Sequence, residues 1–401
     1  MRILLCHNHY RDAGGESAVF ELERDGLRAH GHEIATFTRS NADLDELGLL
    51  RKALVVPNAF FARDVERELR TLIASFRPQL AIVQNTFPLL SPAVYGVLAA
   101  AAVPIIQAVY NYRLICPGAH LYTEGAICER CLGGNFTHAV VHRCYRDSAP
   151  LSAWYAAIIA AHRRLGTFER IDRFMVPDAF LASKLAQGGF DASRMRVNSN
   201  PFFVAGHQAV TDHQGYVLFV GRLVRQKGIL TLLEAMQDAP SEQRLVVVGM
   251  GELEDEVKER VRAPALRDKV EFRGPVWGEQ IRLLLAGCSA LVVPSEWYDN
   301  LPQIVCQALA VGKPIVASRI DGLPEHVREG DNGFLFEPGN ARDLVRALAR
   351  LRACDAAAYA DLAVRCRRYA EAELDYAAHH ARILAMADEL HAEGKLRVER
   401  P

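Results

Sequence analysis

The sequence predicts an α/β protein built from two doubly wound parallel sheets, and three observations support this prediction. Short apolar runs alternate with helical patterns along most of the chain, as in parallel strands joined by crossover helices. The 401 residues are 50% hydrophobic and 24% charged, a globular composition with room for two domains. A turn-forming cluster, Asn-Ser-Asn-Pro at 198–201, separates two sets of strand candidates.

The strand candidates fall on both sides of that cluster. The first set covers residues 3–6, 33–37, 80–83, 104–109 and 173–176, and the second covers 216–220, 245–248, 270–272, 291–293, 315–317 and 333–336. Ligands of doubly wound sheets bind beyond the carboxyl ends of the strands, so the residues after these runs are the candidate site residues. We therefore expect an N-terminal domain at 1–200 that contains a Cys-rich excursion (residues 113–146), a C-terminal domain at 201–371 and a helix at 372–392.

Charge and composition exclude several functional classes. The net charge of −1 argues against a nucleic-acid binder, which usually has a basic excess. No apolar run reaches the roughly 18 residues of a membrane helix, and the first residues lack a signal-peptide layout. Nine cysteines fit reduced thiols or a metal site better than a disulfide framework. We expect a cytoplasmic protein.

The segment 294–318 follows a strand candidate and carries the strongest signal. After the strand come Pro294 and Ser295, a polar turn with Asp299 and Asn300, and a helix expected to open near Pro302. A helix N-terminus beside these side chains suits an anionic, hydroxyl-rich ligand. An ordinary strand-to-helix connection is the alternative.

Two further turns in the second half follow strand candidates. Arg222 and Lys227, in the run GRLVRQKG, can clamp a diphosphate at a strand end, although a solvated surface pair is the commoner arrangement. Gly249 and Gly251 follow the next strand candidate and form either a structural turn or the wall of a nucleotide site.

In the first half, Gly14 and Gly15 open a helix after the first strand, where backbone N–H groups can approach a phosphate. A simple loop is the alternative. Tyr110 follows the 104–109 strand; a tyrosine cannot act as a base near pH 7 but can hydrogen-bond. The stretch 151–164 is apolar and then basic, which fits a buried helix or an interfacial one.

Four cysteines, Cys116, Cys128, Cys131 and Cys144, have the spacing C-x11-C-x2-C-x12-C inside the excursion. One close pair with two flanking thiolates suits a tetrahedral structural zinc, and His142 can replace one ligand. Four reduced cysteines with packing roles are the alternative. The remaining five cysteines look like scattered core thiols.

Segment 294–318, GRLVRQKG and the N-terminal run MRILLCHNHYRDAGGES resemble the signatures of retaining glycosyltransferases of family 4, which have the GT-B fold with two Rossmann-like domains facing a cleft. The resemblance implies that Arg222 and Lys227 neutralise a donor diphosphate and that Asp299 holds sugar hydroxyls. It also implies contacts to the donor by the remaining matched positions: Gly14, Gly15, Gly221, Gly249, Gly251, Asn300, Leu301 and Gln307.

Three positions depart from the family pattern. Asp299 and Gln307 stand where the family has two glutamates separated by seven residues, and Tyr110 stands where related sequences have a histidine near the reacting sugar. Gln307 still accepts a hydrogen bond from ribose, without a charge.

The resemblance implies a retaining transfer of a sugar from a nucleotide-diphosphate donor to a hydroxyl acceptor, with no catalytic metal. The family context favours a glycan or lipid-linked acceptor, such as a surface-polysaccharide precursor, and contact with the inner face of the membrane. A catalytically impaired sugar-nucleotide-binding protein and a GT-B sugar-nucleotide epimerase are the alternatives.

Overall fold

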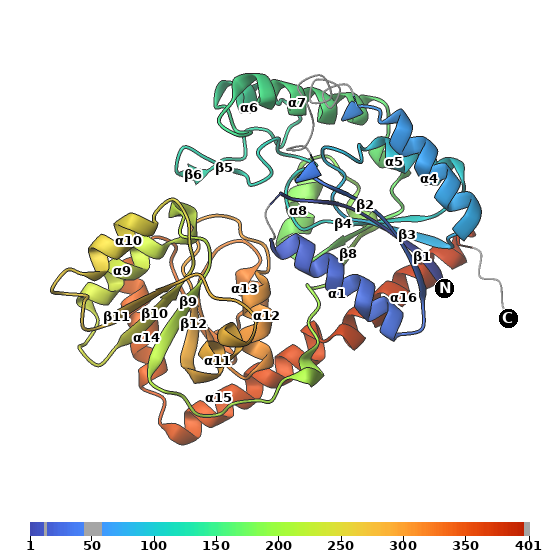
Figure 1. Cartoon of the computed structure of the whole chain (residues 1–401). Helices are drawn as coiled ribbons and strands as arrows, with labels where there is room; N and C mark the ends of the chain where they lie inside the picture. Colours follow the sequence, from blue (N-terminus) through green and yellow to red (C-terminus); the bar gives the residue numbers. More distant parts are fainter. Residues whose placement is uncertain (12–13, 44–57, 397–401) are drawn as a thin grey trace. The chain divides into compact units, whose positions relative to one another are not determined.

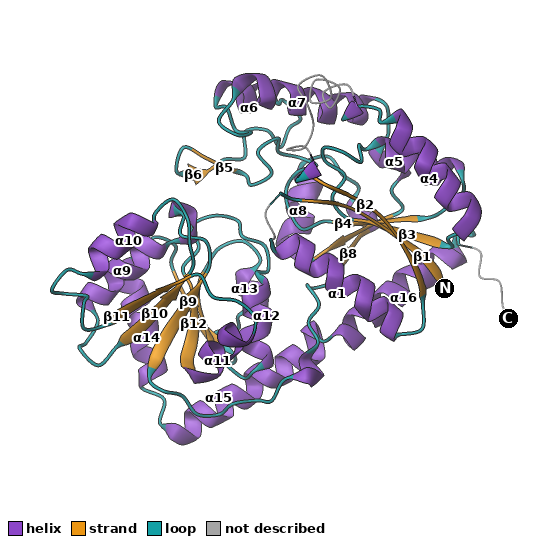
Figure 2. Cartoon of the chain, in the orientation of Figure 1, coloured by secondary structure: helices purple, strands orange, loops and turns teal. Residues whose placement is uncertain are grey.

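The computed structural model describes residues 1–11, 14–43 and 58–396 of the chain (Figure 1). The chain forms two compact units. The first contains Met1–Thr123, Cys128–Ser199 and His379–Pro401, and the second contains Glu124–Ile127 and Asn200–Ala378. Each unit is built around its own parallel sheet (Figure 2).

The sheet of the first unit has six parallel strands in the order β2-β1-β3-β4-β7-β8. The chain starts at β1, adds β2 on one side and then the other strands on the opposite side, so the order reverses between β1 and β3. Such a switch point is where a crevice opens at the carboxyl edge of a sheet. The strands are β1 Arg2–His9, β2 Glu33–Ser40, β3 Leu80–Val83, β4 Ile105–Ala108, β7 Arg173–Val176 and β8 Met195–Val197.

Helices cover both faces of this sheet. α1 and α16 lie on one side and α4 and α5 on the other (Figure 1). The central strands are continuous apolar runs because both of their faces are covered; in β1, Ile3, Leu4, Leu5 and Cys6 are all buried. The helices are α1 Gly15–Ala29, α4 Arg63–Phe76, α5 Ala93–Ala100, α6 Thr137–Val141, α7 Ala149–Arg164, α8 Ala179–Gln187 and α16 Tyr376–Ala392.

The sheet of the second unit has six parallel strands in the order β11-β10-β9-β12-β13-β14, so its switch point lies between β9 and β12. Alternate residues of β9 enter two different core clusters, Leu218 in one and Val217 and Phe219 in the other. The strands are β9 Tyr216–Val220, β10 Arg244–Val248, β11 Val270–Gly274, β12 Cys288–Val293, β13 Ile315–Ser318 and β14 Gly333–Phe336.

Helices of the second unit connect these strands and pack on the two clusters. The helix expected to open near Pro302 is α12, which begins at Gln303 with Pro302 as its extended N-cap residue. The α-helices are α9 Ile229–Asp238, α10 Glu254–Val261, α11 Glu279–Gly287, α12 Gln303–Ala310, α13 Leu323–His326, α14 Ala341–Arg352 and α15 Ala356–Tyr369.

Every predicted strand is present, with boundaries that differ by a few residues at most. The prediction missed β8, which is only three residues long and leaves Val197 half exposed, and the short hairpin of β5 (Tyr122–Thr123) and β6 (Ala126–Ile127). The helix expected at 372–392 is present as α16, but it begins later, at Tyr376. A π-helical run, Ala370–Leu374, continues α15, and the extended backbone of Asp375 separates it from α16.

Candidate functional site

In the second unit, the loops that follow β9 and β12 meet at the switch point of the sheet. Lys227 lies after β9, and its Nζ is 2.6 Å from each carboxylate oxygen of Asp299, which lies after β12. Ser295 donates a hydrogen bond of 2.8 Å to the same carboxylate. Lys227 also lies over the Trp297 ring, 5.7 Å from its centroid. The side chains of Lys227 and Asp299 are 19% and 5% exposed, so this ion pair is largely withdrawn from water.

Glycines allow these loops to approach closely. A Cβ on Gly228 would lie 1.7 Å from the Pro294 carbonyl oxygen, and one on Gly249 would lie 1.9 Å from the Gly221 oxygen. A Cβ on Gly251 would lie 2.6 Å from the Leu223 oxygen. Gly249 and Gly251, which were predicted for the donor site, therefore pack the loop after β10 against the loop after β9, and Gly228 packs the loop after β9 against the loop after β12. These glycines therefore have a structural role, because a side chain at any of them would collide with a backbone carbonyl oxygen.

Asp321, in the loop after β13, binds the turn that carries Asp299. Its Oδ2 accepts from the backbone N–H of Asp299 and, at 3.1 Å, from that of Asn300, while Oδ1 accepts from Leu323 N–H at 2.7 Å. Asn300 and Asp321 both have positive φ, at 51°. The backbone N–H of Asn300, a residue that the resemblance assigns to the donor site, thus donates to Asp321 in this structure. Strained backbone of this kind clusters at functional sites.

The other predicted residues of this unit lie at the same edge of the sheet or near it. Arg222 follows β9 and is exposed, and no ion pair of its guanidinium is found in the described part of the chain. Leu301 is buried in the core, with its carbonyl accepting from Asn200 at 2.6 Å. Gln307 is half-buried on α12. The structure therefore brings Lys227 and Asp299 together and leaves Arg222 open to solvent.

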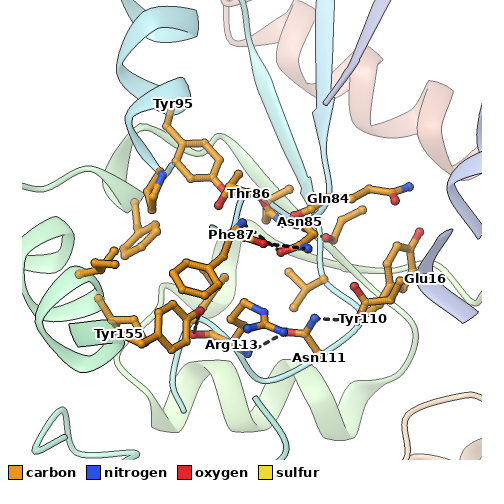
Figure 3. Close-up of a pocket in the computed structure, with 18 residues that line it drawn as sticks. Glu16, Gln84, Asn85, Thr86, Phe87, Tyr95, Tyr110, Asn111, Arg113 and Tyr155 are labelled. Carbon is orange, nitrogen blue, oxygen red and sulfur yellow. Dashed lines mark hydrogen bonds between the residues drawn. The ribbon is translucent and has the colours of Figure 1, made fainter. Parts of the chain in front are cut away.

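The first unit has a cavity of about 40 Å³ at the carboxyl edge of its sheet, lined by residues that follow β3 and β4 and by Glu16 of α1 (Figure 3). Glu16 accepts hydrogen bonds from Tyr10 Oη at 2.9 Å and from Asn111 Nδ2 at 2.7 Å. Asn111 Oδ1 accepts from the Arg113 backbone N–H at 2.8 Å. This network joins the loop after β1 to the loop after β4.

Arg113 is the cation of this cavity. Its guanidinium lies 5.7 Å from the centroids of the Tyr10, Phe87 and Tyr155 rings, and it donates to Tyr10 Oη at 3.2 Å. Burial opposes the charge of Arg113, but interactions with Tyr10, Tyr155 and Glu16 outweigh it and raise its pKa. An arginine held among aromatic faces is a preformed site for a polar or anionic ligand group.

Tyr110 and Gln84 complete the polar lining. Burial, with smaller contributions from Glu23 and Glu16, raises the pKa of Tyr110 well above its ordinary value, so its phenol stays protonated. Gln84 is only 6% exposed, and neither of its carboxamide atoms has a hydrogen-bond partner among the described residues. In Figure 3, Gln84 and Glu16 lie at one end of the cavity, and Tyr95 and Tyr155 lie at the other. A buried amide without partners is available to a polar ligand.

Gly14 and Gly15 lie at the start of α1, as the sequence predicted; Gly14 is the N-cap residue and Gly15 the first residue of the helix. A Cβ on Gly15 would meet no atom within 4 Å, so open space lies beside this residue. Two residues of the N-terminal signature, Asp12 and Ala13, lie outside the described part of the chain. The start of α1 is accessible to a ligand.

The four predicted zinc ligands line a single small cavity together with His138 and His142. All four are free thiols. At their present side-chain positions, no three His, Cys, Asp or Glu residues of the described chain form a group that could hold a metal. Of the other cysteines, Cys6, Cys288, Cys306 and Cys366 are buried as expected, whereas Cys354 is only partly buried.

The apolar and basic stretch 151–164 lies in α7, which is largely a buried helix, one of the two alternatives that the sequence left open. Tyr155, Ile158 and Ile159 are buried in a core cluster, so much of the helix is interior. Leu151 and Leu165, at or beyond its ends, are exposed. Within the described residues, no helix is long and apolar enough to cross a bilayer.

Sequence reasoning missed several site residues, chiefly Asp321, Trp297, Glu16, Gln84 and Arg113. Gln84 directly follows β3 and Asp321 lies three residues after the end of β13, so inspecting the loop after every strand would have found both. The pairing of Glu16 with Asn111 has no such signal. It depends on the proximity of α1 and the loop after β4, which only the folded chain reveals.

Comparisons with known proteins bear on both units. Residues 207–373 match the family model "Glycosyl transferases group 1". Sulfoquinovosyl transferase SQD2 of Arabidopsis thaliana is 29% identical over 198 residues, 45% of this chain and 38% of that protein. The lipopolysaccharide core biosynthesis glycosyltransferase LpsE of Rhizobium meliloti is 30% identical over 196 residues, 47% of this chain and 56% of that protein.

Among solved structures, Anabaena Alr3699/HepE in complex with UDP superposes with a TM-score of 0.67 and 18% identity, over 97% of this chain and all of that one. The chain thus spans less than two thirds of the sequence relatives but the whole of this structural neighbour. Residues 207–373 thus match the group 1 glycosyltransferase model, and the two parallel-sheet units have the GT-B fold.

Proposed function

We propose that this protein is a retaining family 4 glycosyltransferase that moves a hexosyl group from a nucleotide-diphosphate donor to a hydroxyl acceptor. The observation that carries the proposal is the Lys227–Asp299 ion pair at the β9/β12 switch point. It places a cation, which can bind a diphosphate, beside a carboxylate, which can bind sugar hydroxyls. The resemblance of segment 294–318 and the UDP complex of the structural neighbour support the same donor class.

The proposed chemistry depends on charge stabilisation at the leaving group. As the bond to the diphosphate breaks, negative charge develops on its oxygens, and Lys227 and Arg222 stabilise it. Asp299 exchanges its contact with Lys227 for hydrogen bonds from the sugar hydroxyls. Under a same-face mechanism a donor phosphate oxygen takes the acceptor proton, so the neutral phenol of Tyr110 need not act as a base. The proposal includes no catalytic metal.

For the acceptor, we propose a lipid-linked or surface-polysaccharide precursor bound by the first unit, with transfer at the cytoplasmic face of the membrane. The similarity to the Rhizobium lipopolysaccharide core biosynthesis glycosyltransferase supports this class. The Arg113 cavity offers cationic, aromatic and amide groups to a polar headgroup or sugar. Exposed Val141 and Leu165 beside α6 and α7 support peripheral membrane contact. Flotation with anionic vesicles tests that contact.

The experiment is a panel of nucleotide sugars incubated with the protein and a cell lipid extract, with products identified by mass spectrometry. Lys227→Ala and Arg222→Ala should each lower transfer by about a hundredfold or more, as loss of one preorganised charge-stabilising group does. Arg225→Ala is the matched control, since Arg225 is an exposed cation of the same turn. Near-normal rates in both folded variants would exclude this donor site.

A sugar-nucleotide-binding protein without catalysis is the second candidate. The buried Tyr110 favours it, because related sequences of the family have a histidine at this position. If the wild type binds donors without turnover and Tyr110→His starts transfer, this second candidate is correct. Under the proposed function, Gln307→Glu should lower the donor Michaelis constant with little change in turnover, because a ribose contact is similar in ground and transition states.

A further inference from the structure

The four cysteines of the Cys-rich excursion (residues 113–146) converge although they come from different turns. Cys116, Cys128, Cys131 and Cys144 line one cavity of about 10 Å³, close to the lower limit for a single water-sized body. The space therefore fits one small ion and excludes an organic cofactor.

Polar groups contact two of these sulfur atoms. Cys128 Sγ accepts from Arg130 Nε at 3.2 Å, and Cys144 Sγ lies 3.7 Å from Thr123 Oγ1. A donor aimed at sulfur favours a thiolate and fixes its orientation, as the outer contacts of a metal ligand do.

The backbone of the excursion is tightly turned around the cavity. Of the eleven described non-glycine residues with positive φ, five lie in this segment: Ala119, Leu121, Glu124, Arg143 and Arg146. A Cβ on Gly118 would lie 3.2 Å from the Cys144 carbonyl oxygen, so the first and last cysteines of the set approach through a glycine. Left-handed residues persist only where the surroundings over-determine them. The small core cluster that includes Cys131 and Phe136 supplies part of that constraint.

We propose that Cys116, Cys128, Cys131 and Cys144 bind one structural Zn²⁺ as a tetrahedral set of four thiolates. Ligand bonds of about 2.3 Å put sulfurs about 3.8 Å apart in a tetrahedron, so the cysteine side chains must move from their present positions to bind the ion. His142 is not in the set, because its Nε2 is engaged by Arg130. Binding releases the thiol protons.

The site fixes the loop that lines the Arg113 cavity. Cys116 is three residues after Arg113, its N–H donates to the Tyr112 carbonyl at 2.8 Å, and the Tyr112 N–H donates to Ala119 at 3.1 Å. Holding Cys116 thereby holds the turn between β4 and the excursion. The proposal concerns stability and order, so it stands or falls independently of the proposed transfer reaction.

The test uses the full chain purified without chelator. Metal analysis should give about one zinc per chain, and this zinc should be lost in Cys128→Ser combined with Cys131→Ser. Cys354→Ser is the matched control, since Cys354 is a partly buried thiol far from the set in sequence, and it should keep its zinc. Cobalt substitution of the wild type should give thiolate charge-transfer bands.

A second measurement, on the wild type, tests the proposal even if the double variant fails to fold. A strong chelator added to the wild type should lower its melting temperature, and Zn²⁺ but not Mg²⁺ should restore it. Protein that carries no zinc, whose melting temperature is unchanged by chelator and by added Zn²⁺, overturns the proposal. So does cobalt-loaded protein without thiolate bands, or zinc retained by the folded double variant.

Discussion

Replacing Gly228 with alanine should destabilise the second unit by about 2–5 kcal/mol. Gly228 has a φ of +69°, where an L-residue with a side chain costs roughly 1–2 kcal/mol. The added Cβ would also lie 1.7 Å from the Pro294 carbonyl oxygen, a backbone atom that cannot rotate away. Relieving such overpacking typically costs about 1–3 kcal/mol more. The loop bearing Lys227 must move away from the loop bearing Asp299.

Gly330→Ala is the matched control for this change. Gly330 has nearly the same φ, +74°, but a Cβ there would meet nothing within 4 Å. At roughly 2–4 °C per kcal/mol for a unit of this size, Gly228→Ala should lower the melting temperature by about 10 °C and Gly330→Ala by about 4 °C. Differential scanning calorimetry of the two variants measures the difference. Equal shifts would refute the reasoning that steric contact, and not backbone conformation alone, requires glycine at 228.

Three other perturbations follow from the hydrogen bonds and the buried histidines. Asp321→Ala orphans the backbone N–H groups of Asp299 and Asn300 and should cost about 1–3 kcal/mol in urea unfolding, whereas an unchanged midpoint would show that water replaces the carboxylate. Glu16→Ala removes the acceptor of two donors in the first unit and should lower the free energy of unfolding by a similar amount. Glu21→Ala, at an exposed-face position of the same helix, is the control. Equal stability of the two variants would contradict the network. Burial, reinforced by Arg328, lowers the pKa of His326 to about 4, so as pH falls from about 6.5 to about 4 the unfolded chain gains a proton that the folded one refuses, and up to about 3 kcal/mol of stability is lost. Urea titrations at pH 7 and pH 4.5 should show a smaller loss for His326→Gln than for the wild type, and an identical loss would rule out this residue as the cause.

Strands could be predicted from the sequence more completely than contacts between residues far apart in the sequence. Residues 80–83 and 216–220 were found because strands covered on both faces are continuous apolar runs. The Lys227–Asp299 pair was not foreseen, although both residues were chosen, because their contact depends on β9 and β12 being neighbours in the sheet. The helix break at Asp375 was missed for a related reason. Its extended backbone pairs with Phe202, far away in the sequence.

The Lys227–Asp299 contact also bears on how a ligand leaves. On the proposed function, a complete sugar nucleotide satisfies both members of the pair at once, the phosphate meeting Lys227 and the sugar hydroxyls meeting Asp299. A bare nucleoside diphosphate satisfies only Lys227 and leaves a desolvated carboxylate beside it without a counter-charge. On this proposal, once the sugar has been transferred, Asp299 competes with the diphosphate for Lys227 and favours release of the nucleoside diphosphate. The ion pair would then distinguish a complete sugar nucleotide from the nucleoside diphosphate product.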